Sequence, residues 1–106
     1  MQATLLVRRR DYIAQDLFTE IVIWRVPRSL PGSRHDLKYR LALVDAGVCV
    51  LRYDNEAGKG DHRHDGDDEQ PYRFIEIAVL LDDFDADVRR YLDERDRHVD
   101  HRQPGA

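Results

Sequence analysis

Apolar and polar residues alternate with a period of two over much of the first half of the chain. The alternation is clearest over residues 16–26 and 37–44, and shorter stretches cover residues 3–9 and 48–54. Successive side chains of a β-strand point to opposite faces, so this period predicts four strands. We expect the single tryptophan, Trp24, to pack in the core of their sheet.

Short polar connections join these stretches. Residues 27–33 contain two prolines and a glycine, which favour a loop, and Gly47 suits the tight turn of a hairpin. Strands that follow one another through short connections usually lie side by side. We therefore expect an antiparallel meander.

The period changes to that of a helix over residues 75–92. Apolar residues there recur every three or four positions, and most of the aspartates fall between them. The apolar stripe consists of Ile77, Leu80, Leu81, Phe84, Val88, Tyr91 and Leu92. This pattern predicts one amphipathic helix.

Together these elements predict an α+β fold, an antiparallel meander of four to five strands with one C-terminal amphipathic helix packed on it. Residues 1–92 would form a single domain, and residues 93–106 a charged, flexible tail. The second face of such a sheet would be open to a partner or to a second copy of the chain in a homodimer.

Composition narrows the class of protein. The chain has 106 residues, one cysteine (Cys49) and no apolar run near the ~20 residues of a membrane span, so we expect a soluble cytoplasmic protein with Cys49 in its core. The net charge of −4 is uneven. Residues 1–64 hold eleven Lys and Arg against eight Asp and Glu, whereas residues 65–106 hold six against thirteen. The first part could therefore attract phosphates although the whole chain is acidic.

Residues 53–74 form a long polar segment that contains two histidines two positions apart, His62 and His64. In an extended segment this spacing puts both imidazoles on one side. Two such rings can act as the acid and the base in the cleavage of a phosphodiester, because the ordinary pKa of histidine lies near neutrality. Two alternatives remain. The histidines could be solvent-exposed loop residues, or they could bind a metal ion together with Asp54 or another nearby carboxylate. We expect no organic cofactor, and we assign no metal site.

Other residues near the two histidines suit the binding of an anion. Lys59 lies between two glycines, Gly58 and Gly60, which let a backbone approach a phosphate closely. Tyr53 and Asp54 could orient the histidines or a ribose. The remaining candidates for binding phosphate or RNA are Arg40, Arg52, Arg63 and Tyr72.

A run of motifs resembles the TumE family of small prokaryotic toxins. The resemblance covers about residues 3–92 and includes I-V-I-W-R-V-P, P-G-S-R-H-D-L-K-Y-R-L and Y-D-N-E-A-G-K-G-D-H-R-H, followed by P-Y-R-F. It implies the toxin of a type II toxin–antitoxin pair, neutralised by a small DNA-binding antitoxin. A helix-opening Ser or Thr is expected where this chain has Ile75.

The resemblance supplies no mechanism, so the activity is inferred from the residues. We expect a small metal-independent ribonuclease in which His62 and His64 are the acid–base pair and Lys59 and Arg63 stabilise the charge of the reacting phosphate. A non-catalytic module that binds an anion or a partner, and a toxin that transfers a phosphoryl or nucleotidyl group, remain alternatives.

Overall fold

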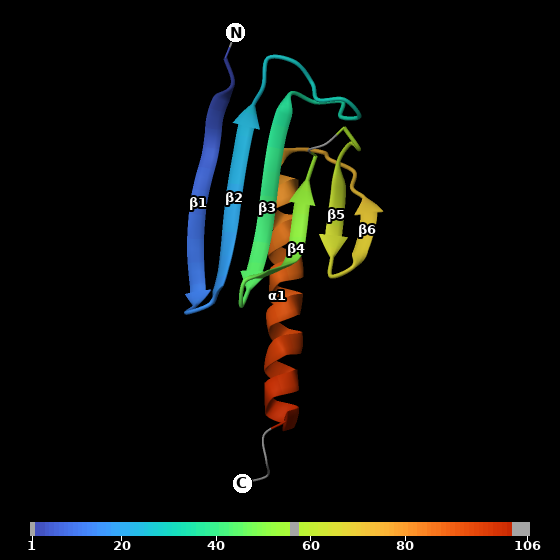
Figure 1. Cartoon of the computed structure of the whole chain (residues 1–106). Coiled ribbons are helices and arrows are strands. Elements are labelled where there is room, and N and C mark those ends of the chain that lie inside the picture. The colour runs from blue at the N-terminus through green and yellow to red at the C-terminus, as the bar shows by residue number, and fades with distance from the viewer. Residues whose placement is uncertain (1, 56–57, 103–106) are drawn as a thin grey trace. The chain divides into compact units, whose positions relative to one another are not determined.

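The computed structural model describes residues 2–55 and 58–102, with side chains described up to Arg97. It divides into two compact units, residues 1–74 and 75–106, which are treated separately below. The first unit is a six-stranded sheet within the described residues (Figure 1). Its strands are β1 (Thr4–Ala14), β2 (Leu17–Arg25), β3 (Leu37–Asp45), β4 (Val48–Asp54), β5 (His62–Asp65) and β6 (Asp68–Pro71).

The strands lie in the order in which they occur along the chain, and every neighbouring pair is antiparallel. The predicted α+β class and the meander are therefore confirmed. The prediction missed the hairpin of β5 and β6, which lies inside the segment interpreted as a loop. Their residues are polar on both sides, so the two strands give no alternating apolar signal.

One face of the sheet carries its apolar core. The residues buried on it share alternate positions of β2, β3 and β4, namely Leu17, Ile21, Ile23, Leu37, Tyr39, Leu41, Leu43, Leu51 and Tyr53. The expectations for Trp24 and Cys49 were wrong. Trp24 is paired with Lys38 on the opposite, more polar face and is only partly buried, while Cys49 is exposed. Both lie within apolar runs whose period does not show which face is buried.

The second unit is the helix α1 (Ile77–Arg102). It begins two positions after the predicted start and continues beyond the predicted end at Leu92, so part of the segment predicted as a tail is helical. Residues 103–106 lie outside the described part of the chain. Among the described residues, no helix meets the length and hydrophobicity that a bilayer span requires.

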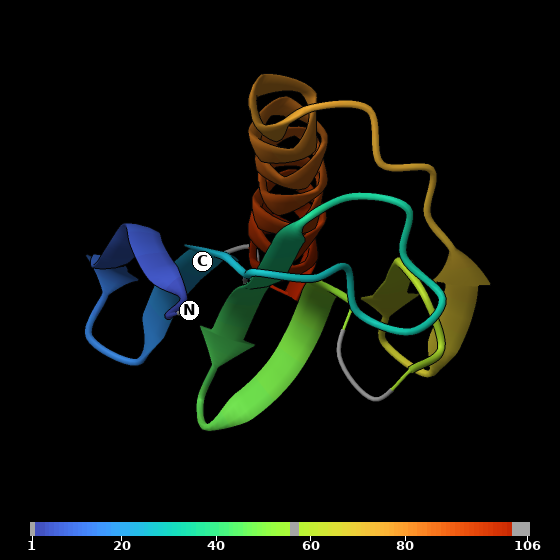
Figure 2. The same ribbon diagram turned by 90° about the horizontal axis from the view of Figure 1, so that it is seen from above.

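The connection between β2 and β3 passes close to the segment that leads into β5 (Figure 2). The contact is made by two glycines with positive φ, Gly32 (86°) and Gly60 (81°). A Cβ atom added to Gly32 would lie 2.6 Å from the backbone nitrogen of Gly60. These two positions need glycine both for the backbone conformation and for the close approach.

We expect Gly32→Ala to destabilise the protein by more than Gly47→Ala. Gly47 also has a positive φ, of 81°, but a Cβ there would meet no atom within 4 Å. Gly47→Ala should therefore cost only the left-handed backbone strain, about 1–2 kcal/mol, whereas Gly32→Ala adds a steric clash with backbone. Urea unfolding of the two variants measures the difference, and equal decreases in stability would contradict the close approach.

Candidate functional site

The register of the sheet gathers five of the predicted site residues on one face. Across β4 and β5, Asp54 is paired with His62 and Arg52 with His64. Residues directly opposite each other, and residues two apart on one strand, have side chains on the same side of a sheet. Arg40 of β3 lies opposite Asp54 and shares this side. We call it the polar face.

His62 is held between a backbone carbonyl and a carboxylate. Its Nδ1 lies 2.9 Å from the carbonyl oxygen of Gly60, and its Nε2 lies 2.5 Å from Oδ1 of Asp54. Both neighbours are acceptors, although the close approach to Asp54 does not have the geometry of a hydrogen bond. Because the side chains of His62 and Asp54 are only 9% and 7% exposed, the pair is nearly removed from water. The arrangement places the ring of His62 beside the negative charge of Asp54.

His64 faces a cation instead of an anion. Nη2 of Arg52 lies 2.9 Å from Nε2 of His64, and a guanidinium can only donate, so this ring nitrogen is unprotonated. Burial lowers the pKa of His64, and the positive charge of Arg52 lowers it further. His64 is therefore neutral near pH 7 and carries its proton on Nδ1, which lies 3.9 Å from Oε2 of Glu69.

The two imidazoles are thus close together and have neighbours of opposite charge. Their ring centroids are 4.9 Å apart, with the planes inclined by 73°. A protonated ring can give a proton and a neutral ring can accept one, which is the complement that general acid–base catalysis needs. In this arrangement Asp54 and Arg52 occupy the reactive nitrogens, so a substrate would have to replace these contacts.

Arg52 joins the two halves of the site. Its Nε lies 2.8 Å from Oδ2 of Asp54, while its Nη2 contacts His64. Neither Nε of Arg52 nor Oδ1 of Asp54 forms a hydrogen bond of good geometry to the described residues. The contact between Arg52 and Asp54 is therefore chiefly electrostatic, whereas the contact between Arg52 and His64 is a hydrogen bond.

Asp54, His62 and His64 also have the geometry to hold a metal ion. One ligand atom from each lies within 4.8 Å of the others, and two imidazoles with a carboxylate suit zinc and related divalent ions. The guanidinium of Arg52 lies beside two of the three ligands, at 2.8 Å and 2.9 Å. A metal ion could bind there only if the guanidinium of Arg52 moved away, because the two cations would repel each other.

Lys59 lies near the pair but contacts it only through Glu69. Its Nζ is 3.6 Å from Oε1 of Glu69, whose other oxygen is the one near His64. Gly58 and Gly60 flank the lysine with φ values of 72° and 81°. Through Glu69 and the carbonyl of Gly60, this glycine turn is connected to both imidazoles.

Three other predicted residues lie away from the polar face. Tyr53 and Arg63 alternate with the site residues along β4 and β5, so they point to the opposite face. Nε of Arg63 donates to the hydroxyl of Tyr53 at 3.2 Å, and the Tyr53 ring meets Tyr72 edge-on at 5.0 Å. The structure therefore separates these residues from the imidazole pair.

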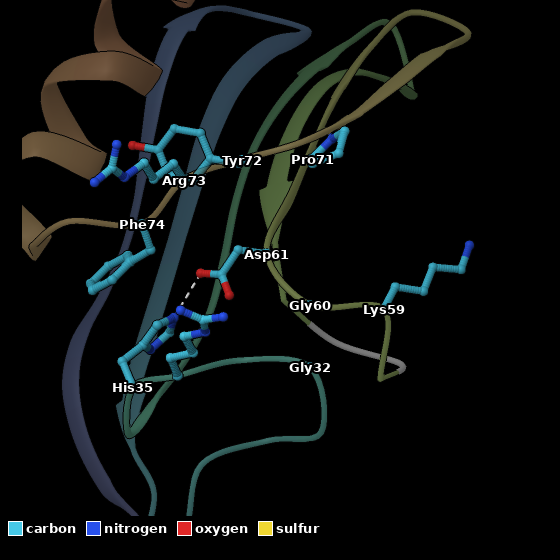
Figure 3. A pocket seen from close by; sticks show the side chains of 10 residues that line it. Gly32, His35, Lys59, Gly60, Asp61, Pro71, Tyr72, Arg73 and Phe74 are labelled. Atoms are coloured by element: carbon cyan, nitrogen blue, oxygen red, sulfur yellow. Dashed lines mark hydrogen bonds and ion pairs between the residues drawn. The ribbon is translucent and has the colours of Figure 1, made fainter.

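A cavity of about 470 Å³ opens near Tyr72, between the 26–36 loop, the segment just before β5 and the segment after β6 (Figure 3). Its lining includes Arg34, Arg73, Lys59 and Phe74. Figure 3 shows the lysine side chain directed away from the cavity floor, in accord with its contact with Glu69. The cavity does not include the imidazole pair.

The floor of this cavity is the carboxylate of Asp61, which already has three donors. It accepts from Ser33 Oγ at 2.7 Å and from the hydroxyl of Tyr39 at 2.8 Å, and His35 Nε2 lies 2.6 Å away. The backbone N–H of Leu37 donates to Nδ1 of His35, so His35 carries its proton on Nε2. Burial, followed by the bond to Asp61, raises the pKa of Tyr39, which stays a phenol. These groups form hydrogen bonds with one another and hold the loops together.

Asn55 adds further hydrogen bonds between the same loops, a role that was not predicted from the sequence. It is fully buried, donates to the carbonyl of Leu37 at 2.7 Å and to Ser33 Oγ at 3.2 Å, and accepts the N–H of Tyr39 at 3.0 Å. An asparagine after a strand is typical of a turn, so the sequence carries no sign of its burial. Asp54 and Asn55, adjacent in the chain, thus serve the polar face and the loops respectively.

Comparison with known proteins gives one match. A family model described as toxin TumE matches residues 3–92. No curated protein and no solved structure matches the chain. The match covers every strand and the first part of α1.

The contact between Arg52 and His64 predicts a measurable titration. We expect Arg52→Gln to raise the pKa of His64, because the nearby positive charge is removed while the burial remains. Arg63→Gln, on the opposite face, is the matched control and should leave the pKa of His64 unchanged. An NMR titration of the histidine rings measures both variants, and an unchanged His64 in Arg52→Gln would refute the contact.

Proposed function

Because the chain belongs to the TumE family of toxins, we propose that it inhibits growth by cleaving RNA at the polar face. It acts in the cytoplasm, and its partner is an antitoxin that we take to be a small DNA-binding protein. The observation that supports RNA cleavage is the pair of adjacent imidazoles, one beside a carboxylate and one beside a guanidinium. Two groups of this kind can move the two protons that the reaction requires.

In the proposed reaction His64 is the base and His62 the acid. Nε2 of His64 takes the proton of a ribose 2′-hydroxyl, and the oxygen attacks the adjacent phosphorus. The bond from phosphorus to the 5′-oxygen breaks, and His62 gives that oxygen a proton. The products are a 2′,3′-cyclic phosphate and a 5′-hydroxyl, with the extra proton now on His64 and His62 neutral. Exchange with water restores both rings.

The neighbouring charges support these roles. Asp54 stabilises the imidazolium of His62 at 2.5 Å and is a positioning residue. Arg52 leaves Nε2 of His64 for a phosphate oxygen, which frees the base as it neutralises the developing negative charge. Arg40 lies next to Asp54 across the sheet and supplies a second cation. Lys59 is 3.6 Å from Glu69, and in this proposal it turns toward the bound phosphate to add a third.

We expect His64→Gln and His62→Gln each to slow RNA cleavage by about 10²–10⁴-fold, the usual contribution of one acid or base. Arg89→Gln is the control, because Arg89 is exposed on α1 and pairs only locally with Asp85. Labelled RNA should be cleaved in EDTA to fragments ending in a cyclic phosphate. Cleavage by His64→Gln at the rate of the unaltered protein would refute the pair, and loss of activity in EDTA would favour a metal at Asp54, His62 and His64.

The same pair should determine toxicity. Induced expression of the unaltered chain is expected to arrest growth, and His62→Gln/His64→Gln to relieve the arrest at equal protein level. Co-expression of a neighbouring antitoxin gene should restore growth of cells with the unaltered chain. Arrest by a double variant that is folded and lacks ribonuclease activity would separate toxicity from RNA cleavage.

A further inference from the structure

The polar face extends well beyond the two imidazoles. The register of β1 to β5 aligns two rows of side chains across it, one directly beside the other. The first row is Arg8, Val22, Arg40, Asp54 and His62, and the second is Arg10, Glu20, Ala42, Arg52 and His64. Each row leads from the edge strand β1 to one imidazole.

Positive charge predominates in these rows although the chain as a whole has a net charge of −4. The rows contain four arginines against the carboxylates of Glu20 and Asp54. Glu20 lies between Arg10 and Arg40, contacts Arg10 directly, and is 3.5 Å from Arg40. Its charge is therefore offset by two guanidiniums, and the surface between β1 and β3 remains attractive to a polyanion.

Aromatic rings lie beside the same rows. Trp24 is partly exposed and is paired across the sheet with Lys38. Near the other end of β2, Tyr12 of β1 lies opposite Phe18. Tyr12 is 61% exposed, and its ring centroid is 5.1 Å from that of Phe18. The guanidinium of Arg10 lies over the Phe18 ring at 4.5 Å. Such rings offer flat apolar surfaces next to cations, the combination on which unpaired bases stack.

Two hollows lie along this surface. One of about 370 Å³ is lined by Arg8, Arg10 and Glu20 among others, and one of about 170 Å³ by Trp24 and Arg40 among others. The basic surface is therefore uneven, with space for groups of the size of a base or a phosphate beside the arginines.

We infer that the polar face binds single-stranded RNA along these rows, from the arginines of β1 past Trp24 to the imidazoles. This inference rests on the proposed action on RNA and adds the form of the substrate and the residues that select it. A duplex keeps its bases stacked inside, where Trp24 and Tyr12 cannot reach them. A single strand can place a base on an aromatic ring while its phosphates contact the arginines.

Binding can be measured without cleavage by using a 2′-O-methyl oligonucleotide, which lacks the attacking hydroxyl. Trp24 is the only tryptophan in the chain, so its fluorescence reports directly on the surface. A labelled single strand should quench Trp24 and bind more tightly than the corresponding duplex. Arg8→Gln/Arg10→Gln should reduce the dependence of log affinity on log salt by about 0.7 for each phosphate that the variant no longer neutralises.

Trp24→Leu should weaken binding by roughly 5- to 150-fold, the range expected when one base can no longer stack. The matched control is Arg89→Gln/Arg97→Gln, which removes the same charge from exposed positions of α1 and should leave the salt dependence unchanged. Circular dichroism of each variant checks that it is folded. The quenching of Trp24 is measured on the unaltered chain, so that test does not depend on the folding of any variant.

Equal affinity for single strand and duplex, or no quenching of Trp24, would overturn the inference. Quenching of Trp24 by an acidic polypeptide such as polyglutamate, but not by RNA, would also overturn it, because the face would then fit an acidic protein partner. If Arg8→Gln/Arg10→Gln and Trp24→Leu both bound RNA as tightly as the unaltered chain and RNA cleavage were normal, only the inferred binding path along these rows would be refuted. Tight, arginine-dependent binding without any cleavage of ordinary RNA would refute the proposed catalysis and support the path.

Discussion

The register of the sheet is the constraint on which the rest of the structure depends. Leu17, Ile23, Leu41 and Leu51 are buried on one face, and a slip of one residue in the pairing of β2, β3 or β4 with one another would move such a set into solvent. Burying a large apolar side chain contributes about 1.5–3 kcal/mol, so a slip would cost several times that amount. The apolar face therefore fixes which residues of β2, β3 and β4 lie opposite one another on the other face, where the apolar requirement is absent.

The polar face derives its chemistry from the alignment of β4 with β5, a strand that has no apolar residue of its own. Asp54 and Arg52 are two apart on β4, and each faces one histidine of β5. An anion opposite one ring favours its charged form, and a cation opposite the other favours its neutral form. The two side chains are chemically identical, so the difference between them comes from their cross-strand neighbours. Asp54 is nearly buried, and its carboxylate lies 2.8 Å from Arg52 as well as 2.5 Å from His62, so the charge of Asp54 keeps a partner even when one of these side chains is removed.

Much of the fold followed from the sequence where the apolar period was strong. The predicted strand over residues 48–54 matches β4, and the turn at Gly47 lies where expected. The period did not show which face of β2 is buried, so Trp24 was assigned to the wrong side. A bulge between Leu5 and Val7 similarly breaks the simple alternation of β1. The hairpin of β5 and β6 left no apolar signal, because its stability comes from pairing with β4 and from polar contacts.

The candidate site was predictable in part. The spacing of His62 and His64 was enough to place both rings on one side, because the segment is extended as supposed. Arg63, one position from each, had to point away for the same reason, and it contacts Tyr53 instead. The burial of Asn55 and the three donors on Asp61 depend on loops that meet at Gly32 and Gly60. Contacts between segments this far apart in the chain leave no local pattern to read.

The proposed acid–base pair requires that the two neighbouring imidazoles carry different numbers of protons. Long-range ¹H–¹⁵N correlation spectra of the histidine rings at neutral pH, assigned with single-histidine variants, test it most directly. The account predicts protons on both nitrogens of His62, and on Nδ1 alone for His64. Two neutral rings, or a proton on Nε2 of His64, would contradict it.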